Sequence, residues 1–239
     1  SLKLNFEDSD RFWDARVSNA ELKMLLERIE KRAVDKIPTP YLLQEAWLIE
    51  HPFYCDVRVI IPRSYIAELL KDELAPWVSN PENVTRVLDL CTGSGCLGII
   101  AAEVFPNAKV DCVDISQDAL DVAKINVERY GMQDRIELIK SDLFNELGDR
   151  QSLFLLLLRG FRGCDRLCRF AALGDDGLDI VRRLMTDSKA HLTNRGVMVV
   201  EVGDGKDACE AAYPKVPFTW LATENEDAMV YLLRKDELP

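Results

Sequence analysis

Residues 87–103, VLDLCTGSGCLGIIAAE, constrain the fold of this chain more than any other segment. An apolar run ends in a stretch of small residues with glycines at Gly93 and Gly95, and apolar residues at helical spacing begin at Leu97. This order predicts a strand, a tight turn and the first turn of a helix. Glycine lets a ligand approach the backbone closely, and the start of a helix leaves N–H groups unpaired. The segment therefore predicts a ligand-binding turn.

The chain after residue 80 alternates between strand and helix patterns. Helices are predicted at residues 96–105, 118–130, 176–191 and 206–212. Strands are predicted at residues 86–90, 109–114, 136–140, 152–158, 196–201, 219–222 and 228–233. The alternation is typical of an α/β fold with a mostly parallel, seven-stranded sheet and helices on both faces. Ligands of such sheets bind beyond the carboxyl ends of the strands.

Prolines at Pro76 and Pro81 mark a boundary before this domain. We expect residues 1–80 to form a small helical and hairpin region and residues 81–239 to form the main domain. The sequence SNAE at residues 18–21 has the form of a capping box and predicts a helix to about residue 33. Residues 47–49 and 57–61 predict a short hairpin that ends at Pro62, and Ser64 is expected to begin another helix.

Composition disfavours several kinds of function. The net charge of −11 argues against a broad basic surface, so no direct nucleic-acid binding is expected. Neither a secretory signal nor an apolar run of about 20 residues is present, so no membrane association is expected. Seven scattered cysteines do not resemble a disulfide framework and indicate a reducing, cytoplasmic compartment. Cys164 and Cys168 lack a second pair of ligands, so no metal site is predicted.

Two acidic residues indicate which cofactor the turn would bind. Asp114 ends the second strand of the main domain about 20 residues after Gly93, where a carboxylate can accept the hydroxyls of a ribose. Residues 93–98 also match the GxGxxG pattern, so a nicotinamide cofactor is an alternative. Asp89, just before the turn, suits a ligand with a cationic amino-acid end and suits a pyrophosphate poorly. S-adenosylmethionine, with its ammonium, sulfonium and ribose, is such a ligand.

With S-adenosylmethionine as the cofactor, the sequence predicts the following site. Asp89 would face the methionine end of the cofactor, Asp114 would bind the ribose with Ile115 beside it, and Asp142 and Leu143 would border the adenine. An equally good interpretation of Asp142 is that it caps the segment after the third strand. The turn that lines the cofactor would consist of Cys91, Thr92, Gly93, Ser94 and Gly95.

Residues 87–131, followed by IELIKSDLF, resemble the class I methyltransferases that modify glutamine side chains in proteins. The upstream segment YLLQEAWLIEHPFYCDVRVIIPRSYIAELL is similar to the branch that acts on a large-subunit (50S) ribosomal protein, and GDDGLDIVRRL and GVMVVEVG continue the match. The resemblance implies a class I methyltransferase fold, S-adenosylmethionine as cofactor and a glutamine side-chain amide as acceptor. It also implies that Pro62 and Arg63 lie near the cofactor mouth on the substrate side. A turn proline and a surface arginine are the alternative interpretation.

The family's Asn-Pro-Pro-Tyr signature is missing from its expected place. The resemblance implies that its Asn and first Pro carbonyl accept hydrogen bonds from the substrate amide. Residues 151–173 read QSLFLLLLRGFRGCDRLCRFAAL instead, so no catalytic residue is assigned, and Asn80-Pro81 lies in the wrong place to substitute. This stretch could be a basic amphipathic element, a genuine loss of the catalytic loop or a local error such as a reading-frame slip. We favour the error, because the match resumes abruptly at residues 174–177.

Other functions compete with methylation of a ribosomal protein. A release factor or another molecule could be the methyl acceptor. The chain could also be a catalytically degenerate protein that still binds the cofactor. A nicotinamide-dependent dehydrogenase is disfavoured by the argument from Asp89.

Overall fold

The structure is a computed structural model that describes residues 14, 16–158, 176–222 and 229–239, with the backbone alone for residues 153–158. The amino-terminal elements are α1 (Asn19–Ala33), α2 (Thr39–Leu43), β1 (Ala46–Leu48), β2 (His51–Phe53) and α3 (Tyr65–Lys71). The remaining helices are α4 (Cys96–Val104), α5 (Gln117–Arg129), α6 (Asp179–His191) and α7 (Lys206–Ala212). The remaining strands are β3 (Arg86–Leu90), β4 (Lys109–Asp114), β5 (Ile136–Lys140), β6 (Ser152–Leu158), β7 (Leu192–Glu201), β8 (Thr219–Leu221) and β9 (Val230–Arg234).

Seven strands form one sheet in the order β5-β4-β3-β6-β7-β9-β8. The first five of these are parallel, while β9 runs antiparallel to both β7 and β8. The mostly parallel α/β fold is therefore confirmed. The chain builds outward from β3 to β4 and β5 and then crosses to β6 on the other side of β3. Such a reversal opens a crevice at the carboxyl ends of the strands.

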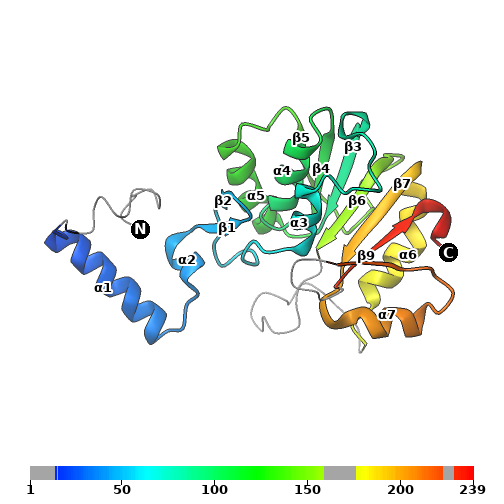
Figure 1. Cartoon of the computed structure of the whole chain (residues 1–239). Coiled ribbons are helices and arrows are strands. Elements are labelled where there is room, and N and C mark those ends of the chain that lie inside the picture. Colours follow the sequence, from blue (N-terminus) through cyan, green and yellow to red (C-terminus); the bar gives the residue numbers. More distant parts are fainter. Residues whose placement is uncertain (1–13, 15, 159–175, 223–228) are drawn as a thin grey trace.

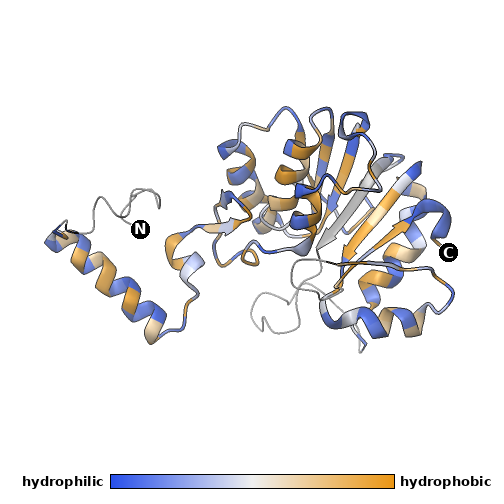
Figure 2. Ribbon diagram, in the orientation of Figure 1, coloured by the Kyte–Doolittle hydropathy of each residue, from blue (hydrophilic) through white to orange (hydrophobic). Residues whose placement is uncertain are grey.

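Helices cover both faces of the sheet, with α4 and α5 on one face and α6 and α7 on the other (Figure 1). Alternate residues of β3 supply the two cores, as the two-residue period of a strand requires. Val87 packs with the buried residues of α3 and α4, whereas Leu88 and Leu90 pack with those of α6. Strand β7, which lies near the middle of the sheet, is accordingly orange over much of its length (Figure 2).

The helix predicted from the capping box is confirmed as α1. The Ser18 hydroxyl accepts a hydrogen bond from the Glu21 N–H at 3.3 Å, and the Glu21 carboxylate accepts one from the Ser18 N–H at 2.8 Å. None of the residues of α1 is buried, and Leu22, Leu26 and Ile29 are about half exposed or more. The helix lies apart from the sheet (Figures 1 and 2). Its apolar stripe thus contributes nothing to the core of the described structure.

The predicted hairpin has a different second strand. Leu48 of β1 pairs with His51 of β2, which leaves a two-residue turn in which Ile49 has a φ of 54°. Residues 57–61 form no strand, so their assignment to the hairpin is wrong. Val59 is nevertheless buried, because it packs in a small cluster with Val122 of α5. Alternating apolar residues here reflect packing against a helix and not pairing in a sheet.

The other predicted boundaries hold to within a few residues. The helix that begins at Ser64 is confirmed, since the Ser64 hydroxyl caps α3 by accepting the Ile66 N–H at 3.1 Å. Helix α6 begins at Asp179 and not at residue 176, and β7 begins at Leu192 and not at residue 196. No helix in the described part of the chain combines the length and apolarity that a membrane span needs.

Candidate functional site

The strand, turn and helix predicted from residues 87–103 are confirmed. The turn after β3 contains three residues with positive φ: Cys91 at 56°, Gly93 at 56° and Gly95 at 78°. At Gly95, a Cβ would approach the Cβ of Ala123 in α5 to 3.2 Å, so both space and conformation favour glycine. The Thr92 N–H donates to the Val113 carbonyl at 2.9 Å. The turn is therefore fastened to the carboxyl end of β4.

Asp89 lies beneath this turn and is fully buried. Its Oδ2 accepts hydrogen bonds from the Thr92 hydroxyl and from the Gly98 N–H, the latter at 3.0 Å. Its Oδ1 has no hydrogen-bond partner within the described residues. Burial raises the pKa of Asp89 to about 7, against the lowering effect of these two donors. The observed contacts hold the turn in shape, and contact with the methionine end of a cofactor stays a prediction.

This raised pKa predicts a pH-dependent effect of Asp89→Asn on stability. The folded protein holds a proton that the unfolded chain releases between about pH 4 and pH 7, so Asp89 makes the free energy of unfolding fall as pH rises through that window. Asparagine removes this dependence, and each unit of pKa shift corresponds to about 1.4 kcal/mol. We expect the stability of the variant relative to the wild type to increase between pH 5 and pH 8 in urea denaturation. An unchanged difference between the two pH values would contradict a raised pKa.

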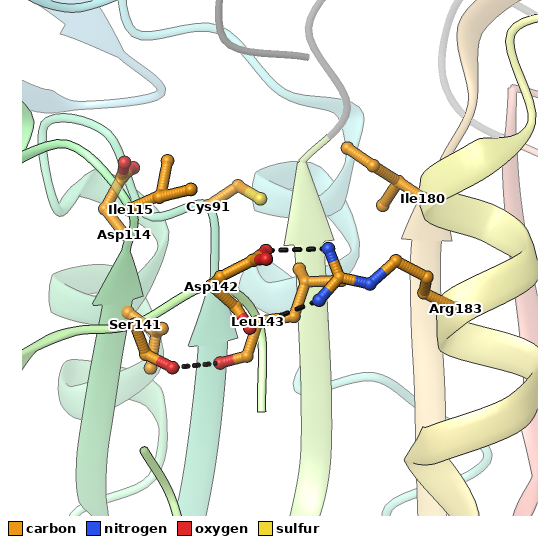
Figure 3. A pocket seen from close by; sticks show the side chains of 9 residues that line it. Cys91, Asp114, Ile115, Ser141, Asp142, Leu143, Ile180 and Arg183 are labelled. Carbon is orange, nitrogen blue, oxygen red and sulfur yellow. Dashed lines mark hydrogen bonds and ion pairs between the residues drawn. The ribbon is translucent and has the colours of Figure 1, made fainter. Parts of the chain in front are cut away.

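A cavity of about 200 Å³ opens at the carboxyl ends of β3, β4 and β5 (Figure 3). Among the predicted site residues, those that line it are Cys91, Asp114, Ile115, Asp142 and Leu143. Thr92, Gly93, Ser94 and Gly95 form the turn next to it. Cys91 and Leu143 both have left-handed backbones, with φ of 56° and 53°. Strained non-glycine residues that persist in a folded protein cluster at ligand sites.

Asp114 is held in a fixed orientation at the mouth of this cavity. Its Oδ2 accepts the Gly93 N–H and its Oδ1 accepts the Ser116 N–H, each at 2.9 Å. Burial raises the pKa of this carboxyl, and the backbone donors oppose that rise. Each carboxylate oxygen has further lone pairs, so an ordered acceptor is available for a pair of hydroxyl groups.

Asp142 pairs with Arg183, which sequence reasoning missed. Arg183 extends from α6, and its Nη1 lies 2.7 Å from Asp142 Oδ1 while its Nη2 donates to the Asp142 carbonyl at 3.3 Å (Figure 3). The observed partner of the Asp142 side chain is therefore a guanidinium and not a helix N–H. Ile180 of α6 lines the same wall. The motif GDDGLDIVRRL contains Ile180 and Arg183, but nothing in it indicates which side of α6 faces the cavity.

Asn126 of α5 is a second residue that sequence reasoning missed. It is fully buried, and its Nδ2 donates to the carbonyls of Ser94 and Tyr54 at 2.8 and 3.0 Å. Its Oδ1 accepts the Tyr54 N–H at 2.7 Å. One side chain thus ties the glycine turn to the segment after β2. An amide within the apolar stripe of the predicted helix was the available signal, because buried polar groups need such partners.

Pro62 and Arg63 line a different cavity, of about 280 Å³. Its other lining residues are Trp47, Leu48, Ser64, Tyr65, Glu68 and Glu201. The proximity of Pro62 and Arg63 to a cofactor therefore stays a prediction. Residues 159–175, where the family signature was expected, lie outside the described residues, as do Cys164 and Cys168. Within the described part of the chain, no group of histidine, cysteine and acidic residues could hold a metal ion.

Comparison with known proteins identifies the family. Residues 69–158 match a family model described as "Methyltransferase small domain". A ribosomal protein uL3 glutamine methyltransferase from Neisseria meningitidis serogroup A is 45% identical over 250 residues, covering 100% of this chain and 82% of that protein. The chain belongs to the ribosomal protein uL3 glutamine methyltransferase family. The resemblance to protein-glutamine methyltransferases of the ribosomal-protein branch is thereby confirmed.

Solved structures place this methyltransferase in the class I fold. Ribosomal protein L11 methylase from Lactobacillus delbrueckii subsp. bulgaricus has a TM-score of 0.53 at 19% identity, covering 75% of this chain and 83% of that chain. An RNA methyltransferase from Salinibacter ruber, in complex with S-adenosyl-L-homocysteine, has a TM-score of 0.50 at 18% identity, covering 75% of this chain and 94% of that chain. At such identities the likeness shows the fold alone.

S-adenosylmethionine is the methyl donor of this class of enzyme, and the cavity fits it. The fixed carboxylate of Asp114 offers acceptors for ribose hydroxyls, while Ile115, half exposed, and Leu143 offer apolar surface for a nucleobase. A Cβ at Gly93 would meet nothing closer than the Cys91 carbonyl oxygen at 4.0 Å, so the turn leaves space at this position beside the cavity. The lining combines the carboxylates of Asp114 and Asp142, the latter paired with Arg183, with apolar side chains, as a nucleoside with a cationic tail requires. The role of each single residue stays a prediction.

Proposed function

We propose that this methyltransferase transfers a methyl group from S-adenosylmethionine to the side-chain amide nitrogen of a glutamine in ribosomal protein uL3, a protein of the large ribosomal subunit. The observation that carries the proposal is 45% identity over the whole chain to a relative with that name. The arrangement of Asp114, Ile115 and Leu143 around one cavity supports the choice of cofactor.

Transfer to an amide needs help from the protein, because conjugation with the carbonyl group makes the amide nitrogen a poor nucleophile. The cofactor supplies an electrophilic methyl group on a sulfonium. In the proposal, Asp114 fixes the ribose, and the turn that Asp89 and Asn126 hold in shape positions the cofactor at the end of β3. Holding the cofactor in a fixed position next to the acceptor amide supplies a large part of the rate enhancement of such reactions.

We further propose that residues 1–80 recognise the acceptor protein and that the chain acts in the cytoplasm. The exposed apolar stripe of α1 supports the first proposal, because none of its residues is needed in the core. Five cysteines of the described residues are free thiols, which supports a reducing compartment. Residue 81 stays the proposed start of the methyltransferase domain.

The proposal is tested by incubating the protein with S-adenosylmethionine and purified uL3. Tandem mass spectrometry should find a gain of one methyl group on a glutamine side chain of uL3. Release factors and ribosomal RNA serve as alternative acceptors in parallel reactions. Methylation of one of these and not of uL3 would contradict the proposed acceptor.

A second candidate function is favoured by the absence of Asn-Pro-Pro-Tyr from residues 151–173. A chain without that signature could bind cofactor and partner without catalysing transfer. In that case S-adenosylmethionine should bind, uL3 should bind, and no acceptor should gain a methyl group.

A further inference from the structure

The cavity lined by Pro62 and Arg63 has a buried carboxylate in its lining. Glu201 is the last residue of β7 and is 2% exposed. Burial raises the pKa of this carboxyl. A buried carboxylate is costly unless hydrogen-bond donors surround it, so its partners decide what this cavity does.

Two donors reach Glu201 from the segment that leads into α3. The Ser64 hydroxyl donates to Glu201 Oε2 at 2.6 Å, and the Tyr65 N–H donates to the same oxygen at 3.1 Å. The charge of Arg63 lies close enough to lower the pKa of Glu201. These contacts fasten the segment after the hairpin to the carboxyl edge of the sheet. The cavity therefore lies between two parts of the chain that these hydrogen bonds hold together.

The position of Glu201 relative to the cofactor cavity follows from the sheet register. Leu90 of β3, Leu157 of β6 and Val200 of β7 form one row across the sheet. Cys91 and Glu201 each lie one residue beyond that row. Neighbouring strands are about 4.8 Å apart, so the strand of Glu201 lies roughly 10 Å from that of Cys91. Each cavity thus has a lining residue at the carboxyl edge of the sheet, with residues of α6 in the first lining and residues of α3 in the second.

The lining of the second cavity suits a polypeptide. Trp47, 61% exposed, forms an apolar wall together with Pro62 and Leu48. Carboxylates at Glu68 and Glu201 disfavour an anionic ligand, while Arg63 disfavours an isolated cation. The ligand should therefore be neutral and should donate N–H hydrogen bonds. It should also carry apolar atoms that pack against the indole of Trp47. Amide groups of a protein chain are such donors.

We propose that this cavity binds the acceptor polypeptide and that Glu201 accepts a hydrogen bond there from one of its amide N–H groups, beside the Trp47 indole. This inference rests on the proposed function, because it takes the acceptor to be a protein. Glu201 is then a positioning residue that lies next to the reaction and takes no part in the transfer itself.

Glu201→Gln separates binding of the acceptor from the hydrogen bonds that Glu201 makes with Ser64 and Tyr65. Its amide oxygen can still accept the Ser64 and Tyr65 donors, but an NH₂ group replaces the second carboxylate oxygen and meets an incoming N–H as donor against donor. We expect the dissociation constant for uL3, and the KM for uL3 where turnover occurs, to rise at least about tenfold. The dissociation constant for S-adenosylmethionine and the value of kcat should change less than about twofold.

Trp47 provides an independent test on the surface. Trp47→Ala should weaken uL3 binding as well, and because the Trp47 side chain is exposed, the substitution removes no buried side chain from the core. Binding of uL3 should also protect Trp47 from acrylamide quenching, measured as the difference between the wild type and Trp47→Phe. Glu137→Gln, at the opposite end of the sheet in β5, is the matched control and should leave uL3 binding unchanged.

The outcomes distinguish this inference from the proposed function. Methylation of uL3 with an unchanged KM in Glu201→Gln and in Trp47→Ala would overturn the role of the cavity and leave the function intact. Absence of methylation would contradict the function, whereas weaker uL3 binding by both variants would still support the cavity. Binding of uL3 that leaves Trp47 as open to acrylamide as before would overturn the inference in either case.

Discussion

Asp114→Ala should weaken the binding of S-adenosylmethionine by about 1–3 kcal/mol, which is roughly a 5- to 150-fold rise in the dissociation constant. The carboxylate is the only acidic group at the mouth of the cavity that two backbone N–H groups, of Gly93 and Ser116, hold in place within the described residues. Its loss removes the hydrogen bonds that we propose it makes with the ribose and also releases the turn at Gly93. Both effects lower the affinity for the cofactor.

Calorimetry with S-adenosylmethionine, S-adenosylhomocysteine and a nicotinamide nucleotide measures this effect. Asp134→Ala is a suitable control, since Asp134 is an exposed acid just before β5, at the opposite end of the sheet. The control should bind both sulfur ligands as the wild type does. Unchanged affinity in Asp114→Ala would remove Asp114 from the site, and binding of the nicotinamide nucleotide alone would overturn the choice of cofactor.

Gly98→Ala should destabilise the fold by about 1–3 kcal/mol or more, because the added methyl group has no space. A Cβ at Gly98 would lie 2.2 Å from Cys112 Sγ and 3.2 Å from Asp89 Oδ2. Cys112 is fully buried in β4, so neither it nor the backbone of α4 can move aside cheaply. The steric cost exceeds the gain of up to about 1 kcal/mol that alanine brings to a helix interior.

Cys112→Ala provides the matched partner for this variant. It removes the sulfur atom that the new methyl group would meet, so the double variant should be more stable than the sum of the two single effects predicts. Urea denaturation of the wild type, both single variants and the double variant measures a coupling energy of about 0.5–3 kcal/mol. Additive effects would show that the crowding lies elsewhere.

Sequence patterns were sufficient for the elements of the main domain because each pattern reflects a local cause. Alternation along β3 divides Val87 and Leu88 between two cores, and the capping box at Ser18 and Glu21 fixes the start of α1. The register of the hairpin could not be predicted from sequence patterns. Its register depends on the turn at Ile49, whereas the apolar residues 57–61 owe their burial to α5.

The residues of the candidate site likewise fall into a predicted group and a group that was not predicted. Asp114 and the glycine turn could be predicted, because the end of a parallel strand and the residues that follow it lie at the ligand-binding edge by topology alone. Arg183, Asn126 and Glu201 were not predicted, since each contributes through a partner that is distant in sequence. Their partners are Asp142, Tyr54 and Ser64, respectively.

The sequence by itself determined the α/β fold, the position of the turn after β3 and the family, because local periodicity, turn chemistry and motif identity are properties of contiguous residues. Only the tertiary structure decided that Asp89 is buried beneath the turn, and that Cys91 and Glu201 line two separate cavities at the carboxyl edge of the sheet. Burial and cavity shape arise where elements pack together, and the register of Leu90, Leu157 and Val200 across three strands sets that arrangement.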